Sequence, residues 1–408
     1  MIKINNLDEA AGVIASAMSA GQHLGVQGLA TKAALGRSCV YDDIIDVSAL
    51  CGIVDYQPEE LILTLRAGTP MDEVEAVVAA AGQMLAFEVP DFSTILNTSG
   101  PGTIGGVIGA NLSGPRRLTA GAARDYLLGF AAVSGRGEAF KSGGKVMKNV
   151  TGYDLSKLIC GSFGTLAIVD EITIKTLPRP ETAVSLLFAC DDLSSAIAGI
   201  AHVFASPHEP GAAAILPAVI AEKTGVGMNA PFVVVIRIEG IAVSVADRAG
   251  HILAGGVGQH STDKAKIDAT QTAALWQAIR DVELLANMEG DIWKLSCPPS
   301  SAPAIIAVLE DRFDMQFFAD WAGGLLWISG PSRAEFGLAL RAALATNGGG
   351  FAQIFRASGA SGGSGEAGDA DISPFQPLSP AHYALHKRVK AAFDPLAVLN
   401  FGRMHNGI

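Results

Sequence analysis

Apolar positions recur at two spacings in the first 180 residues, one typical of helices and the other of strands. Helical spacing over residues 7–20 predicts a first helix. Short apolar runs at residues 44–47 and 61–65 predict strands. Thr69-Pro70 then predicts another helix start, because threonine can cap free N–H groups and proline suits the first turn. This order indicates an α+β domain rather than a plain dinucleotide-binding fold.

A glycine-rich stretch at residues 98–177 forms the centre of this first domain. It contains a strand-like run at residues 127–133, a short helix over 154–159 and a long alternating strand over 165–177. Glycine lets backbone N–H groups approach a ligand closely, and several such groups can hold a large planar cofactor and its phosphates. We interpret the stretch as a cofactor bed. Its glycines on the two sides of the central run include Gly100, Gly102, Gly105, Gly106, Gly109, Gly114, Gly152, Gly161 and Gly164.

Pro178 and Pro180 predict a domain boundary, and the pattern changes after them. Strands and helices alternate from residue 181 to 356 with few glycines outside turns, which predicts a second α/β or α+β domain that holds no phosphate. The strands expected there are residues 184–189, 232–238, 292–296 and 325–328, and the helices are residues 193–204, 243–253, 272–286, 302–309 and 333–345.

The last part of the chain is too short to be a domain. Residues 357–371 are poor in apolar positions and predict a flexible loop. A helix over 380–393 and the tail DPLAVLNFGRM follow, and we expect the tail to pack against one of the two domains. The predicted parts are residues 1–180, 181–356, 357–371 and 372–408.

Composition limits the classes of partner and the cellular compartment that we expect for this protein. A net charge of −11 argues against nucleic acid or an anionic membrane surface as a main partner. No apolar run approaches the ~18 residues of a membrane span. The N-terminal residues lack a signal-peptide pattern, so we expect the cytoplasm, with attachment to the inner face of the membrane through partners left open. The five cysteines are scattered, which predicts reduced thiols and neither a metal nor an iron–sulfur site.

A second glycine-bearing turn, QGLATK at residues 27–32, follows an apolar run. It ends in a hydroxyl and a cation and could cradle a pyrophosphate, although the spacing of a Walker loop is missing. An ordinary turn with a solvated lysine is an equal alternative. Near Gly105-Gly106 we expect a helix whose unpaired N–H groups favour an anionic ligand edge.

Several basic side chains could reach a phosphate or a carboxylate. Arg116, Arg117 and Arg124 follow the first glycine cluster, and for each of them a surface charge is the simpler interpretation. Lys145 and Lys148 are exposed by pattern.

At residues 98–177 the sequence resembles the FAD-binding domain of the vanillyl-alcohol oxidase / p-cresol methylhydroxylase (PCMH-type) superfamily, and the tail resembles the C-terminal motif of that family. More narrowly, GPRR, GGKVMKNVTGYDLSKL, IWKLSCP and DWAGGLLW resemble the FAD-binding E subunits of bacterial glycolate oxidases. The resemblance covers essentially the whole chain. It implies an α+β fold with a two-part PCMH-type FAD-binding domain, an α+β cap domain and a tail that returns to the FAD domain.

The resemblance also implies which residues hold FAD. Covalent attachment in the family uses a histidine or cysteine beside the flavin, and residues 27–36 contain neither, so we expect noncovalent FAD. The implied cofactor-binding residues are Gln27, Gly28, Leu29, Ala30, Thr31, Lys32, Thr103, Ile104, Gly105, Gly106, Asn111, Ser113, Gly114, Tyr153, Asp154, Gly161, Gly164, Thr165 and Ile168.

Two functions follow from the resemblance. In the first, the chain is the FAD-binding subunit of a glycolate or D-lactate oxidoreductase, and it passes electrons from a small 2-hydroxy acid to a partner iron–sulfur subunit. The catalytic subunit of the family carries an H-x-H cap motif, which is absent here, so a second FAD-type subunit would supply it. In the second, the chain is a non-catalytic flavin-carrying relay. The family tail commonly has proline where this chain has Phe401, and no catalytic residue can be assigned.

Overall fold

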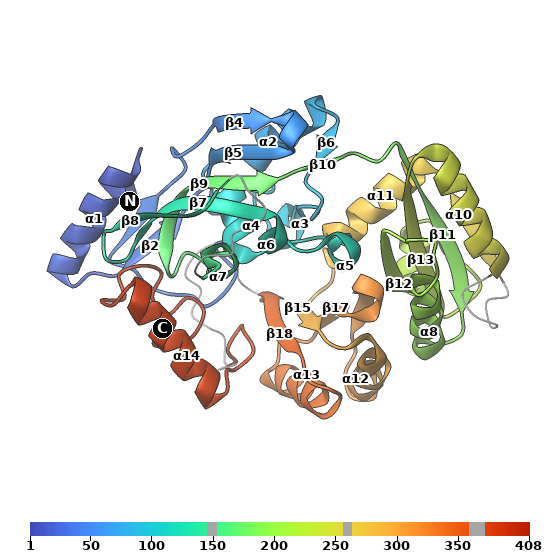
Figure 1. Cartoon of the computed structure of the whole chain (residues 1–408). Coiled ribbons are helices and arrows are strands. Elements are labelled where there is room, and N and C mark those ends of the chain that lie inside the picture. The colour runs from blue at the N-terminus through green and yellow to red at the C-terminus, as the bar shows by residue number, and fades with distance from the viewer. Residues whose placement is uncertain (145–152, 256–262, 359–371) are drawn as a thin grey trace. The chain divides into compact units, whose positions relative to one another are not determined.

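The computed structural model describes residues 1–144, 153–255, 263–358 and 372–408, which form two compact units (Figure 1). Unit 1 comprises Met1–Ser113, Gly121–Arg179 and Pro377–Ile408, and unit 2 comprises Gly114–Ala120 and Pro180–Gln376. Both units combine helices with sheets, as the α+β prediction requires. Lys145, Lys148 and nearly all of the expected loop over 357–371 lie outside the described residues.

Unit 1 contains a three-stranded parallel sheet in the order β1-β3-β2 and a five-stranded antiparallel sheet in the order β4-β5-β9-β7-β8. A small buried core joins the first sheet to α1 and the tail through Ile14, Leu24, Ile45 and Leu399. The central strands of the second sheet, β7 and β9, both come from the glycine-rich stretch. The strands are β1 (Ile2–Lys3), β2 (Leu24–Gln27), β3 (Asp43–Asp46), β4 (Ile53–Gln57), β5 (Ile62–Arg66), β7 (Leu127–Ser134), β8 (Ala139–Gly143) and β9 (Ala167–Lys175), and a separate pair is formed by β6 (Gln83–Met84) and β10 (Leu177–Pro178).

The helices of unit 1 show where local signals hold. In α1 (Leu7–Ala20) the Asn6 side chain accepts a hydrogen bond from the Glu9 N–H. At α2 (Met71–Ala80) the predicted threonine cap is wrong, because the Thr69 hydroxyl accepts from the Gly52 N–H at 2.9 Å instead. The other helices of unit 1 are α3 (Ser93–Leu96), α4 (Ile104–Ala110), α6 (Ala123–Tyr126), α7 (Leu155–Ile159) and α14 (Pro380–Phe393).

Unit 2 is built on an eight-stranded antiparallel sheet in the order β14-β11-β13-β12-β16-β17-β15-β18. Side chains of α8, α10, α12 and α13 pack with those of the sheet into one large core. Strands β12, β14, β16 and β18 and the short helices α5 and α9 were not predicted from the sequence, whereas the other four strands and α8, α10, α11, α12 and α13 were. The bounds are β11 (Thr182–Cys190), β12 (Ala212–Pro217), β13 (Phe232–Gly240), β14 (Lys264–Ile267), β15 (Asp291–Ser296), β16 (Gln316–Asp320), β17 (Leu325–Gly330), β18 (Phe351–Arg356), α5 (Arg117–Ala120), α8 (Leu193–Phe204), α9 (Ala218–Lys223), α10 (Ala242–Gly255), α11 (Ala269–Arg280), α12 (Ala302–Glu310) and α13 (Ala334–Thr346).

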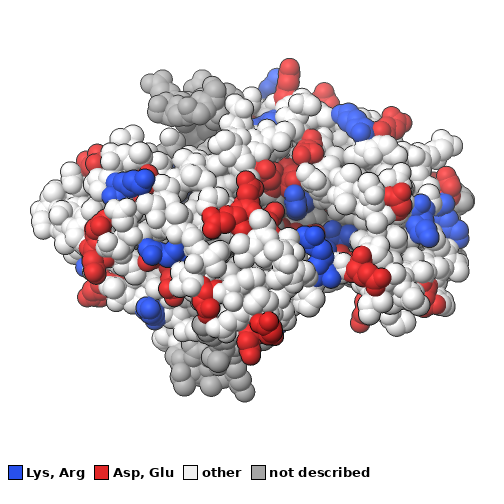
Figure 2. Space-filling view, turned by 90° about the horizontal axis from the view of Figure 1, so that it is seen from above, with Lys and Arg blue, Asp and Glu red and all other residues white. Residues whose placement is uncertain are grey.

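None of the described helices has the length and apolar character that crossing a bilayer requires. On the face drawn in Figure 2, acidic and basic side chains occur in small, mixed groups.

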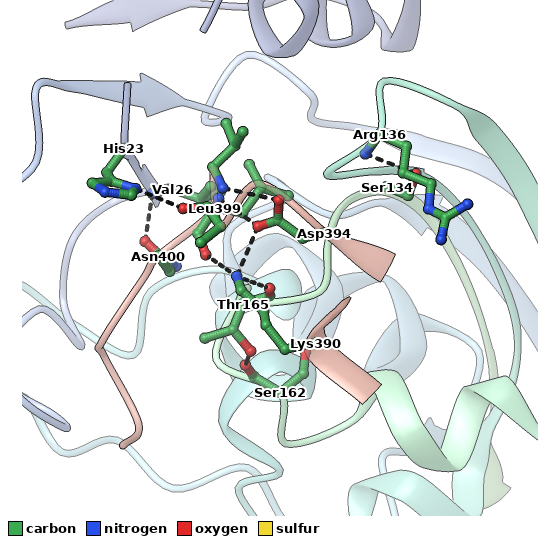
Figure 3. A network of polar contacts seen from close by, with 12 residues as sticks. His23, Val26, Ser134, Arg136, Ser162, Thr165, Lys390, Asp394, Leu399 and Asn400 are labelled. Carbon is green, nitrogen blue, oxygen red and sulfur yellow. Dashed lines mark hydrogen bonds and ion pairs between the residues drawn. The ribbon is translucent and has the colours of Figure 1, made fainter. Parts of the chain in front are cut away.

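The C-terminal tail is fixed to unit 1 by a buried ion pair (Figure 3). The Lys390 Nζ on α14 donates to the Asp394 Oδ2 at 2.7 Å, to the Thr165 carbonyl at 2.6 Å and to the Leu399 carbonyl at 2.7 Å. The Asp394 carboxylate in turn accepts from the N–H groups of Val398 and Leu399, both at 2.8 Å. Side-chain exposure is 6% for Lys390 and 0% for Asp394, so neither charge can turn to water.

We expect Lys390→Met to destabilise unit 1 strongly. The substitution leaves the Asp394 carboxylate buried without its ammonium, and breaking a buried pair from one side costs roughly 3–5 kcal/mol. Urea unfolding of the two proteins measures this loss. Lys387→Met is the matched control, because Lys387 is exposed on the same helix. A loss of stability equal to that of the control would contradict the assignment.

Candidate cofactor site

A groove in unit 1 lies between the end of β2, the start of α4, the turn before β9 and the tail. It encloses about 1150 Å³ of empty space, the part open to solvent included. The sequence-predicted site residues that line it are Gln27, Gly28, Leu29, Ala30, Thr31, Lys32, Thr103, Gly105, Gly106, Gly164 and Ile168.

The turn after β2 offers unused backbone donors to this groove. Within the described chain, none of the N–H groups of residues 28–32 donates a hydrogen bond. Ala30 adopts a left-handed φ of 56°, and successive N–H groups around such a residue can form a concave anion-binding nest. Backbone N–H groups are obligatory donors. Of the two interpretations of this turn, the pyrophosphate cradle is therefore the one that the geometry favours.

Lys32 is held inside the groove rather than solvated. Its Nζ donates to the Pro101 carbonyl at 2.6 Å and lies 3.4 Å from the Thr31 Oγ1. Burial lowers the pKa of Lys32 to about 8, and the nearby Asp91 charge acts in the opposite direction. Because burial disfavours the charged form, an anion bound beside this ammonium would restore its preference for the proton.

The start of α4 differs from the prediction of unpaired N–H groups. The first N–H groups of this helix all have acceptors in the protein, so that prediction is wrong. The bonds run from the Ile104 N–H to the Thr69 carbonyl at 3.0 Å, from the Gly105 N–H to the Ala67 carbonyl at 2.7 Å and from the Gly106 N–H to the Thr103 Oγ1 at 3.3 Å.

The two adjacent glycines at the start of α4, Gly105 and Gly106, have different neighbours. A Cβ at Gly105 would lie 2.7 Å from the Ala67 carbonyl oxygen, so Gly105 is required by packing inside the protein. A Cβ at Gly106 would lie 3.6 Å from the Lys32 Cδ, which is an ordinary contact distance. Gly106 and Lys32 both line the groove. Of these two glycines, Gly106 is the one at which a larger side chain would enter the space of a ligand.

The second glycine cluster forms the wall on the other side of α4. Phe163 and Gly164 have left-handed φ angles of 52° and 68°. The Phe163 N–H donates to the Gly109 carbonyl at 2.8 Å, which fastens the turn to the end of α4. Two glycine-rich segments that lie far apart in the sequence therefore line one groove.

The lining residues that the sequence interpretation missed include Asn400, Tyr41 and Arg403. Asn400 joins the walls, because its Oδ1 accepts from the Val26 N–H and its Nδ2 donates to the Phe163 carbonyl, both at 2.8 Å. The Tyr41 hydroxyl is buried and has no hydrogen-bond partner in the described chain. Arg403 also lines the groove. The FGRM motif of the tail was a signal for Asn400 and Arg403, whereas nothing local marks Tyr41.

Other predicted residues lie outside the groove lining. Tyr153 is 91% exposed, and the Asp154 carboxylate caps α7 by accepting from the Lys157 N–H at 3.2 Å. Asn111 ends α4 in a left-handed conformation with φ 50°. Residues that likewise do not line the groove are Ile104, Ser113, Gly114, Gly161 and Thr165.

The three arginines have protein partners. The Arg116 Nε and Nη2 donate to the two carboxylate oxygens of Glu239, each at 2.7 Å, with both side chains mostly buried. The Arg117 guanidinium lies 4.6 Å from the centre of the Trp321 ring. The Asn111 side-chain oxygen, with the amide turned toward Arg124, accepts from the Arg124 Nη2 at 2.9 Å and from its Nε at 3.1 Å. The interpretation of Arg116 as a surface charge is therefore wrong.

Comparison with known proteins gives the groove a ligand class. A family model described as an FAD binding domain matches residues 1–143. The chain is 34% identical over 383 residues to the glycolate oxidase subunit GlcE of Escherichia coli, which covers 93% of this chain and 92% of that protein. It is 36% identical over 155 residues to the glycolate oxidase subunit GlcD of Bacillus subtilis, covering 38% of this chain and 31% of the relative.

Solved structures show the same fold at low sequence identity. An alkyldihydroxyacetonephosphate synthase matches with a TM-score of 0.66 and 14% identity, over 98% of this chain and 75% of that one. A p-cresol methylhydroxylase matches with a TM-score of 0.65 and 13% identity, over 99% and 88%. The PCMH-type fold and the FAD cofactor predicted from the sequence are confirmed.

The residues of the groove fit FAD. A pyrophosphate can accept hydrogen bonds from the free N–H groups of residues 28–32, and the Lys32 ammonium lies in the same turn. The unpartnered Tyr41 hydroxyl and the Arg403 guanidinium add polar groups to an otherwise glycine-rich and apolar lining. The protein thus provides donors for the phosphates and a close-fitting surface for the rings.

We expect Gly106→Val to fold and to bind no FAD, because its side chain would enter the groove. Absorbance of the purified protein measures the flavin content, and its melting temperature measures the fold. Gly12→Val is the matched control, since Gly12 lies on a helix of the same unit with open space around it. Stoichiometric FAD in folded Gly106→Val would overturn the assignment. Gly105→Ala should instead lower the melting temperature.

We expect Lys32→Met to weaken FAD binding by about tenfold, because one charge-assisted contact is lost while the N–H donors remain. A pKa of about 8 also makes the wild-type affinity depend on pH. The protonated form binds phosphate, so affinity should be constant below pH 7 and fall as pH rises through 8. Flavin fluorescence titrations between pH 6.5 and 9 measure both effects. Equal affinities, or the same pH dependence in Lys32→Met, would exclude a role for this ammonium.

Proposed function

The chain belongs to the family of the glycolate oxidase subunit GlcE, FAD-dependent oxidoreductase subunits, and from this we propose that it is the FAD-binding subunit of a multi-subunit 2-hydroxy-acid oxidoreductase. The observation that carries the proposal is the groove with free N–H groups at residues 28–32, in a chain that aligns with such a subunit over nearly its whole length. Glycolate and D-lactate are the proposed substrates.

The proposed division of labour follows the two units. Unit 1 binds FAD through the turn at residues 27–32, Gly106 and the turn that ends at Gly164. Unit 2 serves as the cap domain. Bound FAD would supply a two-electron acceptor for the α-carbon of the substrate. The chain itself orients the cofactor, neutralises its phosphates and keeps water from the groove.

Noncovalent binding is part of this proposal. The residues that line the groove include no histidine or cysteine that could attach to the flavin. Burial raises the pKa of Cys190 and of Cys297, each to about 11, which keeps these two thiols protonated and unreactive. Denaturation in acid followed by filtration should therefore release the flavin from the polypeptide.

Electrons would leave through a partner. None of the five cysteines forms a disulfide, and the described residues contain no group of His, Cys, Asp or Glu side chains able to hold a metal ion. We infer an iron–sulfur subunit as the acceptor and a GlcD-like subunit, with its own FAD domain and cap histidines, as a further partner. The sequence contains no H-x-H motif, which supports a second candidate function, a flavin relay without a substrate site.

Anaerobic titration of the purified chain with glycolate and with D-lactate tests these functions. Loss of the oxidised flavin absorbance without any partner supports a substrate-oxidising subunit. Retention of the yellow colour, with reduction only when a GlcD-like partner is added, supports the relay. A folded protein that takes up no FAD would refute both.

A further inference from the structure

Three short motifs that are far apart in the sequence meet in unit 2 around Trp321. They are GPRR at residues 114–117, IWKLSCP at 292–298 and DWAGGLLW at 320–327. The Trp321 Nε1 donates to the Gly114 carbonyl at 3.1 Å, and its ring faces the guanidinium of Arg117. The FAD groove of unit 1 includes none of these residues.

The backbone at Trp321 is held in an unusual conformation. Trp321 and Ala322 have consecutive left-handed φ angles of 50° and 56°, which are costly for side chains other than glycine. The Asp320 carboxylate holds the start of this turn by accepting from the Trp321 N–H at 2.7 Å. Such strain persists only where the surroundings enforce it, and it is concentrated at functional sites.

Two cations share the Trp321 ring. The Arg117 Cζ lies 4.6 Å from the ring centre, and the Lys294 Nζ lies 5.6 Å from it. The same ammonium lies 5.6 Å from the centre of the Trp327 ring. Asp320 is the acidic side chain whose charge acts on Lys294. Two positive charges and one negative charge thus leave the cluster with a net charge of +1.

The Lys294 ammonium has no acceptor. Within the described chain it makes neither a hydrogen bond nor an ion pair. Its Nζ lies beside the two indole rings. The buried Lys390 of unit 1 shows what a structural lysine looks like, since carbonyl and carboxylate oxygens surround its Nζ. Burial and the Arg117 charge lower the pKa of Lys294 to about 8, against the opposite effect of Asp320.

The cluster combines a buried base with partly exposed cations. Trp327 is 3% exposed and Asp320 is 2% exposed, so both form a buried base. Lys294, Arg117 and Trp321 are only partly buried. An ammonium that is desolvated but unpaired binds an anion favourably, because the anion supplies the missing acceptor in surroundings where water is scarce.

We infer that Lys294, Arg117 and Trp321 bind the carboxylate of a small hydroxy acid, an inference that rests on the proposed function. The two carboxylate oxygens would accept from the Lys294 ammonium and the Arg117 guanidinium. The indole rings would border the short carbon chain. The net positive charge of the cluster favours an anionic group such as a carboxylate. The three residues are binding residues, and no proton transfer is assigned to them.

Calorimetric titration of the FAD-loaded protein with oxalate tests the inference. Oxalate consists of two carboxylates and lacks the hydroxyl-bearing carbon that is oxidised in a hydroxy acid. We expect saturable binding to the wild type and a loss of affinity of roughly ten- to a hundred-fold in Lys294→Met. Lys294→Arg should retain more affinity than Lys294→Met. Lys223→Met, an exposed lysine of the same unit, should bind oxalate like the wild type.

The pH dependence of the wild type gives a second measurement that needs no variant. Oxalate affinity should be constant below pH 7.5 and fall as pH rises through about 8, because the anion binds the protonated amine. The charged groups that face this amine are Arg117 and Asp320, and such side chains ordinarily titrate far from this range. Should Lys294→Met fail to fold, this profile alone decides.

The outcomes separate this inference from the proposed function. It is overturned if the FAD-loaded wild type binds no oxalate, if Lys294→Met binds it unchanged, or if the affinity does not fall above pH 8. Inorganic phosphate that binds more tightly than oxalate would overturn the carboxylate assignment. Lys294-dependent oxalate binding without flavin reduction by glycolate would leave the inference standing and remove the proposed oxidation. Flavin reduction by glycolate that does not depend on Lys294 would support the proposed oxidation and overturn the inference.

Discussion

The ammonium of Lys390 is the contact on which the architecture of unit 1 depends. It joins α14, the tail and the segment that precedes β9. The Thr165 carbonyl that accepts its hydrogen bond lies 225 residues earlier in the sequence. Thr165 directly follows the turn that walls the groove. Because a buried charge tolerates only fully satisfied surroundings, the ion pair with Asp394 fixes the position of the tail and, through it, the place where Asn400 bridges the two walls.

The two segments that line the groove differ in whether their backbone N–H groups have acceptors within the protein. At the start of α4 the protein satisfies its own N–H groups, so Gly105 serves close packing and Gly106 leaves space in the groove. At residues 28–32 the N–H groups have no acceptor in the described chain. Leu29 and Ala30 are exposed, so water can satisfy their N–H groups, and phosphate oxygens would accept from this turn in place of water. We therefore propose that main-chain groups carry much of the recognition of FAD.

Local patterns predicted the elements whose stability is local. The helices α1, α8 and α14 begin and end at the predicted residues, because helical spacing, capping residues and glycine or proline stops all coincide there. Strand β12 carries the sequence AAAILP, which has little strand preference of its own. It becomes a strand because β13 and β16 pair with it from both sides. No window of sequence contains that information.

The same limit applies to the site. The turn at residues 27–32 was predictable, since its glycine, hydroxyl and cation are adjacent in sequence. The paired N–H groups of α4 were not, because their acceptors, Ala67 and Thr69, belong to another segment. Tyr41 enters the groove from a stretch with no distinguishing pattern. Only the fold brings such residues together.

The order of segments along the chain sets when the groove can be completed. The turn at residues 27–32 and the wall at 161–164 leave the ribosome first, and the whole of unit 2 is synthesised before the tail. Until Asn400 has been translated, the side-chain bridge between Val26 and Phe163 is missing. The two walls of the groove therefore gain this bridge only at the end of translation, and a chain that stops within unit 2 lacks it.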